Sequence, residues 1–101
     1  MITNATITKM QRAADGAAPA DGLEVRCRLQ RPSYTTPTGQ QKPADASAEV
    51  LVGAEHLGQT AAPAVGDRLS IDGDNGRAHQ VRVLAIEAIE HGLHWAYVVE
   101  A

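Results

Sequence analysis

Several classes of protein are excluded by what this 101-residue chain lacks. Cys27 is its single cysteine, so no internal disulfide can form and the disulfide-rich secreted scaffolds are ruled out. No apolar run approaches the roughly 18 residues of a membrane span, and no N-terminal stretch is typical of a signal peptide. We therefore expect a soluble protein that is made in a reducing cytoplasm and does not bind a membrane.

Aromatic and basic side chains are scarce as well. The chain has one Trp, two Tyr and no Phe, and its formal net charge is -3 at pH 7. Proteins that hold nucleic acid by neutralising phosphates need clustered Lys and Arg, and binders of single strands also need stacking aromatics. We therefore expect DNA to be bound only at the weak level of nonspecific contact.

Alanine supplies much of the apolar content. Hydrophobic residues make up 44% of the chain, but 18 of them are Ala and only 20 are Val, Ile or Leu. A domain of this size buries roughly 65% of the surface that its unfolded chain exposes, so the core is modest. We expect residues 1–101 to form one domain and neighbouring chains to contribute to its stability.

Alternation of apolar and polar residues predicts an all-β fold. It is strict over residues 23–30, where Cys27 shares one face with its apolar neighbours. Residues 93–100 repeat it, with Trp95 and Tyr97 on the face that we expect to be buried. The pattern predicts a small antiparallel β-barrel or sandwich of about six strands, with unpaired edges. The other expected strands cover residues 3–11, 48–52, 68–72 and 80–87.

Local irregularities refine this prediction. Over residues 80–87 the apolar side chains fall on both faces, which predicts a central strand buried on both sides or a β-bulge. Asp-Gly and Asn-Gly within residues 72–76 favour the positive φ angles of a tight hairpin. One helical turn is expected over residues 54–57.

The connection between the second and third strands, residues 31–47, is longer than a compact domain needs. It contains Pro32, Pro37 and Pro43 among polar residues, so it cannot pair as a central strand. Loops of this length are usually functional, and we expect this one to contact other subunits. Its candidate interface residues are Arg31, Tyr34, Gln40 and Lys42.

No pattern for catalysis or metal binding is present. Cys27 lies on an apolar face, where burial raises the pKa of a thiol and makes it inert. His91 and His94 are three residues apart on a hairpin and point to opposite faces. Starting at Asp72, the sequence lacks the Gly and the carboxylate that a helix-loop-helix calcium loop requires. We expect no enzyme activity, no cofactor and no metal.

The one basic cluster consists of Arg26, Arg28 and Arg31. Arg26 and Arg28 lie on the polar face of their strand without aromatic neighbours, which disfavours a nucleic-acid surface. A solvated strand face or an ion pair between subunits is the preferred interpretation. Glu24 on the same face is a ready local partner.

Three stretches of the C-terminal half carry a resemblance to a known family. They are VGDRLSIDG over residues 65–73, QVRVLAI over residues 80–86 and HWAYVVE over residues 94–100. The Gly-Asp-Arg turn into a strand, the Asp-Gly hairpin and the amphipathic last strand resemble those of small head-tail connector proteins of tailed bacteriophages. These are head-completion, stopper or joining proteins, and the resemblance covers roughly residues 48–101.

The resemblance implies a structural function in the virion, which would be assembled in the cytoplasm of a bacterial host. Copies would form a homo-oligomeric ring between a portal or adaptor protein on the capsid side and a tail protein on the other. DNA would pass through without specific binding, since lumen carboxylates repel phosphates. Residues 31–47 would gate the channel or bind the adjacent ring.

Other functions stay open at this point. A tail terminator or a capsid-decoration protein would share the composition and differ in symmetry and partner. A small β-barrel adaptor would bind a protein partner through an exposed strand edge. A nucleic-acid-binding barrel would need an open Arg26 and Arg28 face with salt-dependent affinity.

Overall fold

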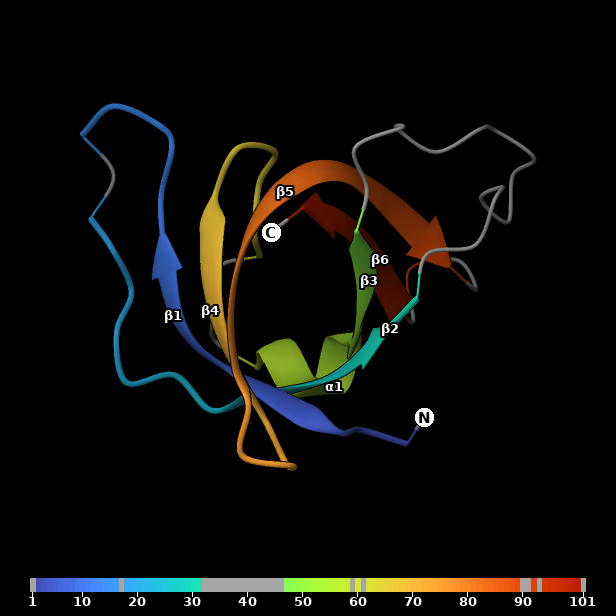
Figure 1. Cartoon of the computed structure of the whole chain (residues 1–101). Helices are drawn as coiled ribbons and strands as arrows, with labels where there is room; N and C mark the ends of the chain where they lie inside the picture. Colours follow the sequence, from blue (N-terminus) through green and yellow to red (C-terminus); the bar gives the residue numbers. More distant parts are fainter. Residues whose placement is uncertain are drawn as a thin grey trace.

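The computed structural model describes residues 2–16, 18–31, 47–58, 60, 62–89, 92 and 94–100. In this part of the chain, six strands form one closed antiparallel barrel in the order β1-β2-β3-β6-β5-β4 (Figure 1). The predicted all-β class is therefore confirmed, as a barrel and not as a sandwich. The strands are β1 (Ala5–Gln11), β2 (Val25–Gln30), β3 (Ala48–Gly53), β4 (Arg68–Gly73), β5 (Ala78–Ile89) and β6 (His94–Glu100).

The predicted alternation has its physical basis in the barrel interior. Ile7 of β1 lies opposite Val25 of β2 and Ile71 of β4, and all three are buried. Because successive side chains of a strand point to opposite faces, every second residue enters the interior. The residues that form this core are Ala5, Ile7, Met10, Val25, Cys27, Val50, Val52, Leu69, Ile71, Val81, Val83, Tyr97 and Val99.

Closure of the barrel corrects one expectation. Each strand pairs with two neighbours, so no strand of the described residues is an edge strand of the sheet. The unpaired edges that we expected of a six-stranded module are absent there, because β1 and β4 join the two ends of the sheet. Neither self-association nor an adaptor function can be argued from an edge strand of this barrel.

The irregular stretch in the sequence is a bulge in β5. The register between β5 and β6 shifts between Val83 and Ala85, which confirms the predicted bulge. The first part of β5 pairs with β4 and the second part pairs with β6, so one long strand serves both neighbours. The bulge bends β5 around the barrel, which the orange ribbon of Figure 1 follows.

Strand β6 is buried on both faces, which the sequence pattern did not predict. Tyr97 and Val99 lie in the interior as expected, but Ala96 and Val98 on the other face are also buried, at 2% and 1% exposure. Trp95 is partly buried and packs against the core.

The topology divides the connections between two ends of the barrel. Since all neighbours are antiparallel, the connections β2–β3 and β4–β5 lie at one end, which we call the mouth. The connections β1–β2, β3–β4 and β5–β6 lie at the other, which we call the far end. The predicted helical turn is α1 (Ala54–Leu57). It lies across the far end, where Leu57 packs against the core (Figure 1).

Candidate functional site

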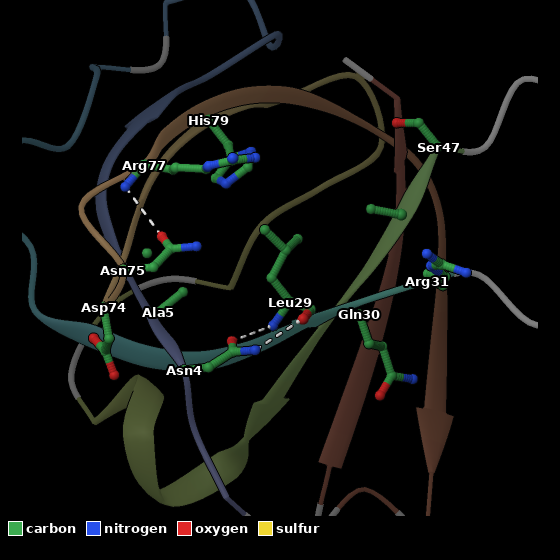
Figure 2. Close-up of a pocket in the computed structure, with 12 residues that line it drawn as sticks. Asn4, Ala5, Leu29, Gln30, Arg31, Ser47, Asp74, Asn75, Arg77 and His79 are labelled. Carbon is green, nitrogen blue, oxygen red and sulfur yellow. Dashed lines mark hydrogen bonds between the residues drawn. The ribbon is translucent and has the colours of Figure 1, made fainter.

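A hollow of about 880 Å³ opens at the mouth of the barrel. It lies between the start of β1, the end of β2, the start of β3 and the hairpin from β4 to β5, so five strands place its wall (Figure 2). Its volume is within the range of ligand sites in proteins, which is roughly 300–1,000 Å³. The lining residues are Asn4, Ala5, Leu29, Gln30, Arg31, Ser47, Ala48, Gly73, Asp74, Asn75, Arg77 and His79.

Two asparagine side chains shape the mouth by binding the backbone. The side-chain Oδ1 of Asn4 accepts from the backbone N–H of Leu29 at 2.8 Å, and its Nδ2 donates to the carbonyl of the same residue at 3.0 Å. In the β4–β5 turn, Asn75 Oδ1 accepts from the N–H of Arg77 at 3.1 Å. Gly76 has a φ of 86°, the left-handed conformation that the Asn-Gly pair was expected to supply. The side-chain amides of Asn4 and Asn75 therefore fix the backbone that forms the wall of the hollow.

The two arginines of the hollow have no carboxylate partner among the described residues. Arg77 reaches toward His79 on one side, and Arg31 lies on the opposite side next to Gln30 (Figure 2). Arg31 and Arg77 are exposed and His79 is half-buried. The mouth therefore presents two exposed arginines, and the exposed carboxylates of Asp72 and Asp74 lie at the same end of the barrel.

Asp74 lies beside this hollow but is bound to Arg26. The Arg26 guanidinium forms a bidentate pair with Asp74 at 2.8 and 2.7 Å and also donates to Thr3 and Thr6. This hydrogen bonding raises the pKa of Arg26 and lowers that of Asp74. The pair ties β2 to the β4–β5 turn across the start of β1.

The contacts of Arg26 correct the expected carboxylate partner and add a reason against nucleic-acid binding at this strand face. Its carboxylate partner is Asp74 and not Glu24, which is next to it on the same strand face in the sequence pattern. The two residues are 48 positions apart, so only the barrel brings them together. Because its donors are used within the chain, Arg26 is a poor candidate for binding phosphate.

At the far end, a buried carboxylate fastens three segments. Asp67 accepts from Arg12 Nη1 at 2.7 Å and from the backbone N–H groups of Ala13 and Ala64 at 2.9 Å each. Burial alone would raise the pKa of Asp67, but these hydrogen bonds outweigh it and hold the pKa below the ordinary value.

The contacts of Gly66 and Asp67 explain why the turn begins with these two residue types. Gly66 has a φ of 92°, and a Cβ there would lie 3.1 Å from the Cβ of Ala13. The N–H of Gly66 donates to the carbonyl of Val83, and the N–H of Val83 donates to the carbonyl of Asp67. The turn therefore anchors the start of β4 to the bulge of β5.

Two titratable groups lie in the barrel interior. Burial raises the pKa of the Cys27 thiol to about 11, in line with the inert thiol that the sequence predicts. Burial also raises the pKa of Tyr97 to about 12. The hydroxyl of Tyr97 has no hydrogen-bond partner among the described residues. Neither group reaches the hollow at the mouth.

The predicted interface residues divide between described and undescribed parts of the chain. Arg31 lines the mouth, where residues 31–47 leave and rejoin the barrel. Tyr34, Gln40 and Lys42 lie outside the described residues, as does His91. Sequence reasoning missed Asn4, Arg77 and His79, because these residues belong to three separate segments and no local spacing connects them.

The described residues hold neither a cluster of metal ligands nor a membrane-spanning helix. Among the described residues, no three His, Cys, Asp or Glu side chains lie close enough together to hold a metal ion. The described helix is too short and too polar to cross a membrane. Comparison of the chain with protein-family models, with curated proteins and with solved structures gives no match.

Proposed function

We propose that this protein is a structural subunit of a tailed bacteriophage virion, where copies form a ring at the head-tail junction. The ring would join a portal or adaptor protein on the capsid side to a tail protein on the other and leave a conduit for DNA. The observation that carries the proposal is the design of the mouth. Arg31 and Ser47, which border the long polar stretch of the sequence, lie together with Arg77 at one end of a closed barrel.

The distribution of polar contacts supports a structural function. Asn4, Arg26 and Asp67 all use their polar atoms to hold strands and turns together. The thiol of Cys27 is buried and its pKa is raised, whereas a nucleophilic cysteine needs a lowered pKa so that the thiolate forms. Arg31 and Arg77 at the mouth have no described carboxylate partner, and they suit binding to another protein surface more than bond cleavage.

The charge of the chain supports a conduit that does not grip DNA. Arg26 is bound to Asp74, so the strand face that carried the nucleic-acid alternative loses one of its two cations. The free protein should therefore bind duplex DNA only with the affinity of nonspecific contacts, roughly 10⁻⁴–10⁻⁶ M at physiological salt. A filter-binding assay in a salt series measures this, and tight, salt-sensitive binding would overturn the conduit.

Counting copies in purified particles tests the proposal and separates it from its alternatives. Quantitative mass spectrometry should find this chain in the number of one ring per particle, measured against the portal protein. A capsid-decoration protein would instead follow the copy number of the major capsid protein. A chain that is absent from particles, or present as a single copy, would overturn the proposal.

The position along the virion distinguishes a connector from a tail terminator. Heads that have packed DNA but carry no tail should retain the chain, and free tails should lack it. The opposite partition would identify a tail terminator. Major capsid and tail-tube proteins serve as markers for the purity of the two fractions.

A further inference from the structure

The outer wall of β1, β4 and β5 carries a small hollow that is separate from the mouth. Figure 1 shows these strands along one side of the barrel, where β4 pairs with both β1 and β5. The hollow measures about 100 Å³, and one water molecule in the liquid occupies roughly 30 Å³. It therefore suits a compact group of a few atoms. The residues that line it are Lys9, Gln11, Arg68, Leu69, Ser70 and Gln80.

A bulge in β1 brings Lys9 to this wall. The register between β1 and β4 shifts between Ile7 and Lys9, so that Thr8 and Lys9 together oppose Ser70. Ile7 and Met10 are buried in the interior, which leaves the two residues between them on the outside. In a regular strand, residue 9 would face the interior together with Ile7. The hydroxyl of Thr8 donates to the carbonyl of Ser70 at 3.3 Å, which holds the bulge against β4.

Two arginines lie directly opposite each other on the same wall. The register pairs Arg68 of β4 with Arg82 of β5, and both are exposed. Like charges at opposite positions of neighbouring strands destabilise a sheet. Glu100 of β6 forms an ion pair with Arg82, whereas no described carboxylate pairs with Arg68 or Lys9. The fold therefore keeps an unfavourable arrangement of positive charge beside the hollow.

The carboxylates of β4 and of the turn before it do not line the hollow. Asp67, which precedes Arg68, is buried and bound to Arg12. Asp72 is exposed two residues beyond Ser70, nearer the mouth, and is not a lining residue. The polar side chains of the hollow are thus two cations and three neutral groups that can donate hydrogen bonds, namely Lys9, Arg68, Gln11, Ser70 and Gln80.

We infer that this hollow binds a phosphate group, which belongs to a free phosphate or to the backbone of a nucleic acid. The guanidinium of Arg68 presents its donors in a fixed fork that matches phosphate oxygens, and Lys9 supplies a point charge. A phosphate group also offers more acceptor oxygens than a carboxylate, so a hollow lined by many donors suits it better. Its negative charge offsets the repulsion between Arg68 and Arg82.

A contact of this kind is consistent with weak binding of DNA. Two cations that each neutralise one phosphate make the logarithm of the binding constant fall with the logarithm of the salt concentration at a slope of roughly -2. Proteins that bind DNA tightly through its backbone make many more phosphate contacts. The site therefore adds a salt-dependent contact within the range of nonspecific binding.

Titration of the full-length protein with inorganic phosphate tests the site. Backbone amide resonances of Lys9, Arg68 and Ser70 should shift in NMR spectra when sodium phosphate replaces sodium chloride at constant ionic strength and neutral pH. Arg68→Gln and Lys9→Gln should each weaken binding by about tenfold, because each removes a charge-assisted hydrogen bond. Arg28→Gln is the matched control, because it removes the same charge from the exposed wall of β2 and should leave phosphate binding unchanged.

A salt series with duplex DNA distinguishes the two sources of the phosphate. If the DNA backbone supplies it, Arg68→Gln should reduce the magnitude of the salt slope by about 1, and Arg28→Gln should not. If DNA binding is unaffected by Arg68→Gln while the binding of inorganic phosphate is weakened, the ligand is a free phosphate or a small phosphorylated molecule. Either result supports the site.

Three results would overturn the inference. The first is a phosphate titration that shifts none of the three resonances, and the second is phosphate binding that Lys9→Gln and Arg68→Gln leave unchanged. The third is a shift of these resonances with poly-glutamate and not with phosphate, which would identify the wall as a surface for an acidic protein.

The stability of the variant separates binding from folding. Because Arg68 is exposed and lies opposite Arg82, Arg68→Gln in chloride should leave the melting temperature unchanged or raise it. A lower melting temperature would show that Arg68 serves the fold and would overturn its assignment to the site. All these measurements use the free protein, so the inference stands or falls independently of the proposed function in a virion.

Discussion

The far end and the mouth of the barrel use their polar residues in opposite ways. At the far end, Asp67 accepts three hydrogen bonds within the chain, and α1 lies over the core. At the mouth, Arg31 and Arg77 border a hollow and find no carboxylate among the described residues. The difference teaches that the charge of the far end is buried and bound within the fold, whereas the mouth keeps two exposed arginines in addition to the contacts that hold its wall.

The largest effect is expected from a change that removes contacts with other subunits and leaves the fold intact. Replacing residues 33–46, which lie outside the described residues, with a short Gly-Ser linker should block particle maturation in a complementation assay. The domain should still fold, because closing a loop of twice the length costs only about 0.6 kcal/mol more. Circular dichroism and thermal melting check the fold.

Two results of the loop replacement would contradict the expectation that residues 31–47 serve contact and not folding. A shortened chain that fails to fold would show that the segment belongs to the stabilising part of the molecule. Infectious particles with the shortened chain would show that the segment is dispensable for assembly.

Truncating Trp95 at the far end should give the largest loss of stability for one residue. Trp95 is the second residue of β6, lies opposite Val52 and packs against the core. Because it is only partly buried, Trp95→Ala should cost about 3 kcal/mol, the lower limit for large aromatic truncations. Urea denaturation measures the change, and an unchanged midpoint would instead mark Trp95 as a contact residue.

Removing the charge of Asp67 should cost nearly as much. Asp67→Asn leaves Arg12 without its carboxylate partner in a mostly buried site, which should lower the free energy of unfolding by about 2–3 kcal/mol. Arg77→Glu at the mouth is the contrasting variant, and its effect should stay within about 0.5 kcal/mol. Equal losses from the two variants would abolish the distinction between the ends.

The pH dependence of the Asp67 contribution has a definite sign. The folded pKa of Asp67 is lowered, whereas an unfolded Asp titrates near about 3.9. The contribution is therefore complete above that pH and is lost as the pH falls toward the folded pKa. Denaturation curves of the unmodified chain and Asp67→Asn should converge below about pH 4, and a constant difference would show that Asp67 does not act through its charge.

The smallest expected effect concerns the interior between the two ends. The Tyr97 hydroxyl is buried without a partner among the described residues, and burial of an unpaired hydroxyl opposes folding. Tyr97→Phe should therefore leave stability unchanged or raise it by up to about 1 kcal/mol. A loss of stability of about 1 kcal/mol would show that the hydroxyl is hydrogen-bonded in solution.

Much of the fold could be predicted from local sequence. Strict alternation located β2, the Asn-Gly pair located the β4–β5 hairpin, and the broken alternation near Leu84 located the bulge. These features depend on neighbours in the chain. Closure of the barrel depends on the pairing of β1 with β4, whose residues are far apart in sequence.

The site could be predicted only in part. Arg31 was found because it borders a long polar connection, whereas Arg77 follows the predicted hairpin turn of residues 72–76 and no motif pointed to it. The hollow arises when the starts of β1 and β3 meet the end of β2 and the β4–β5 turn. Likewise, the local pattern suggested Glu24 as the partner of Arg26, but the register of β1 with β2 and β4 brings Asp74 to it.

Electron cryomicroscopy of the neck of the virion tests the central claim most directly. The account predicts a closed ring of copies of this six-stranded barrel around the DNA channel, between the portal or adaptor and the tail, with residues 31–47 at a contact or in the channel. A neck without this barrel, or the barrel found on the capsid faces or at the tail end, would contradict it.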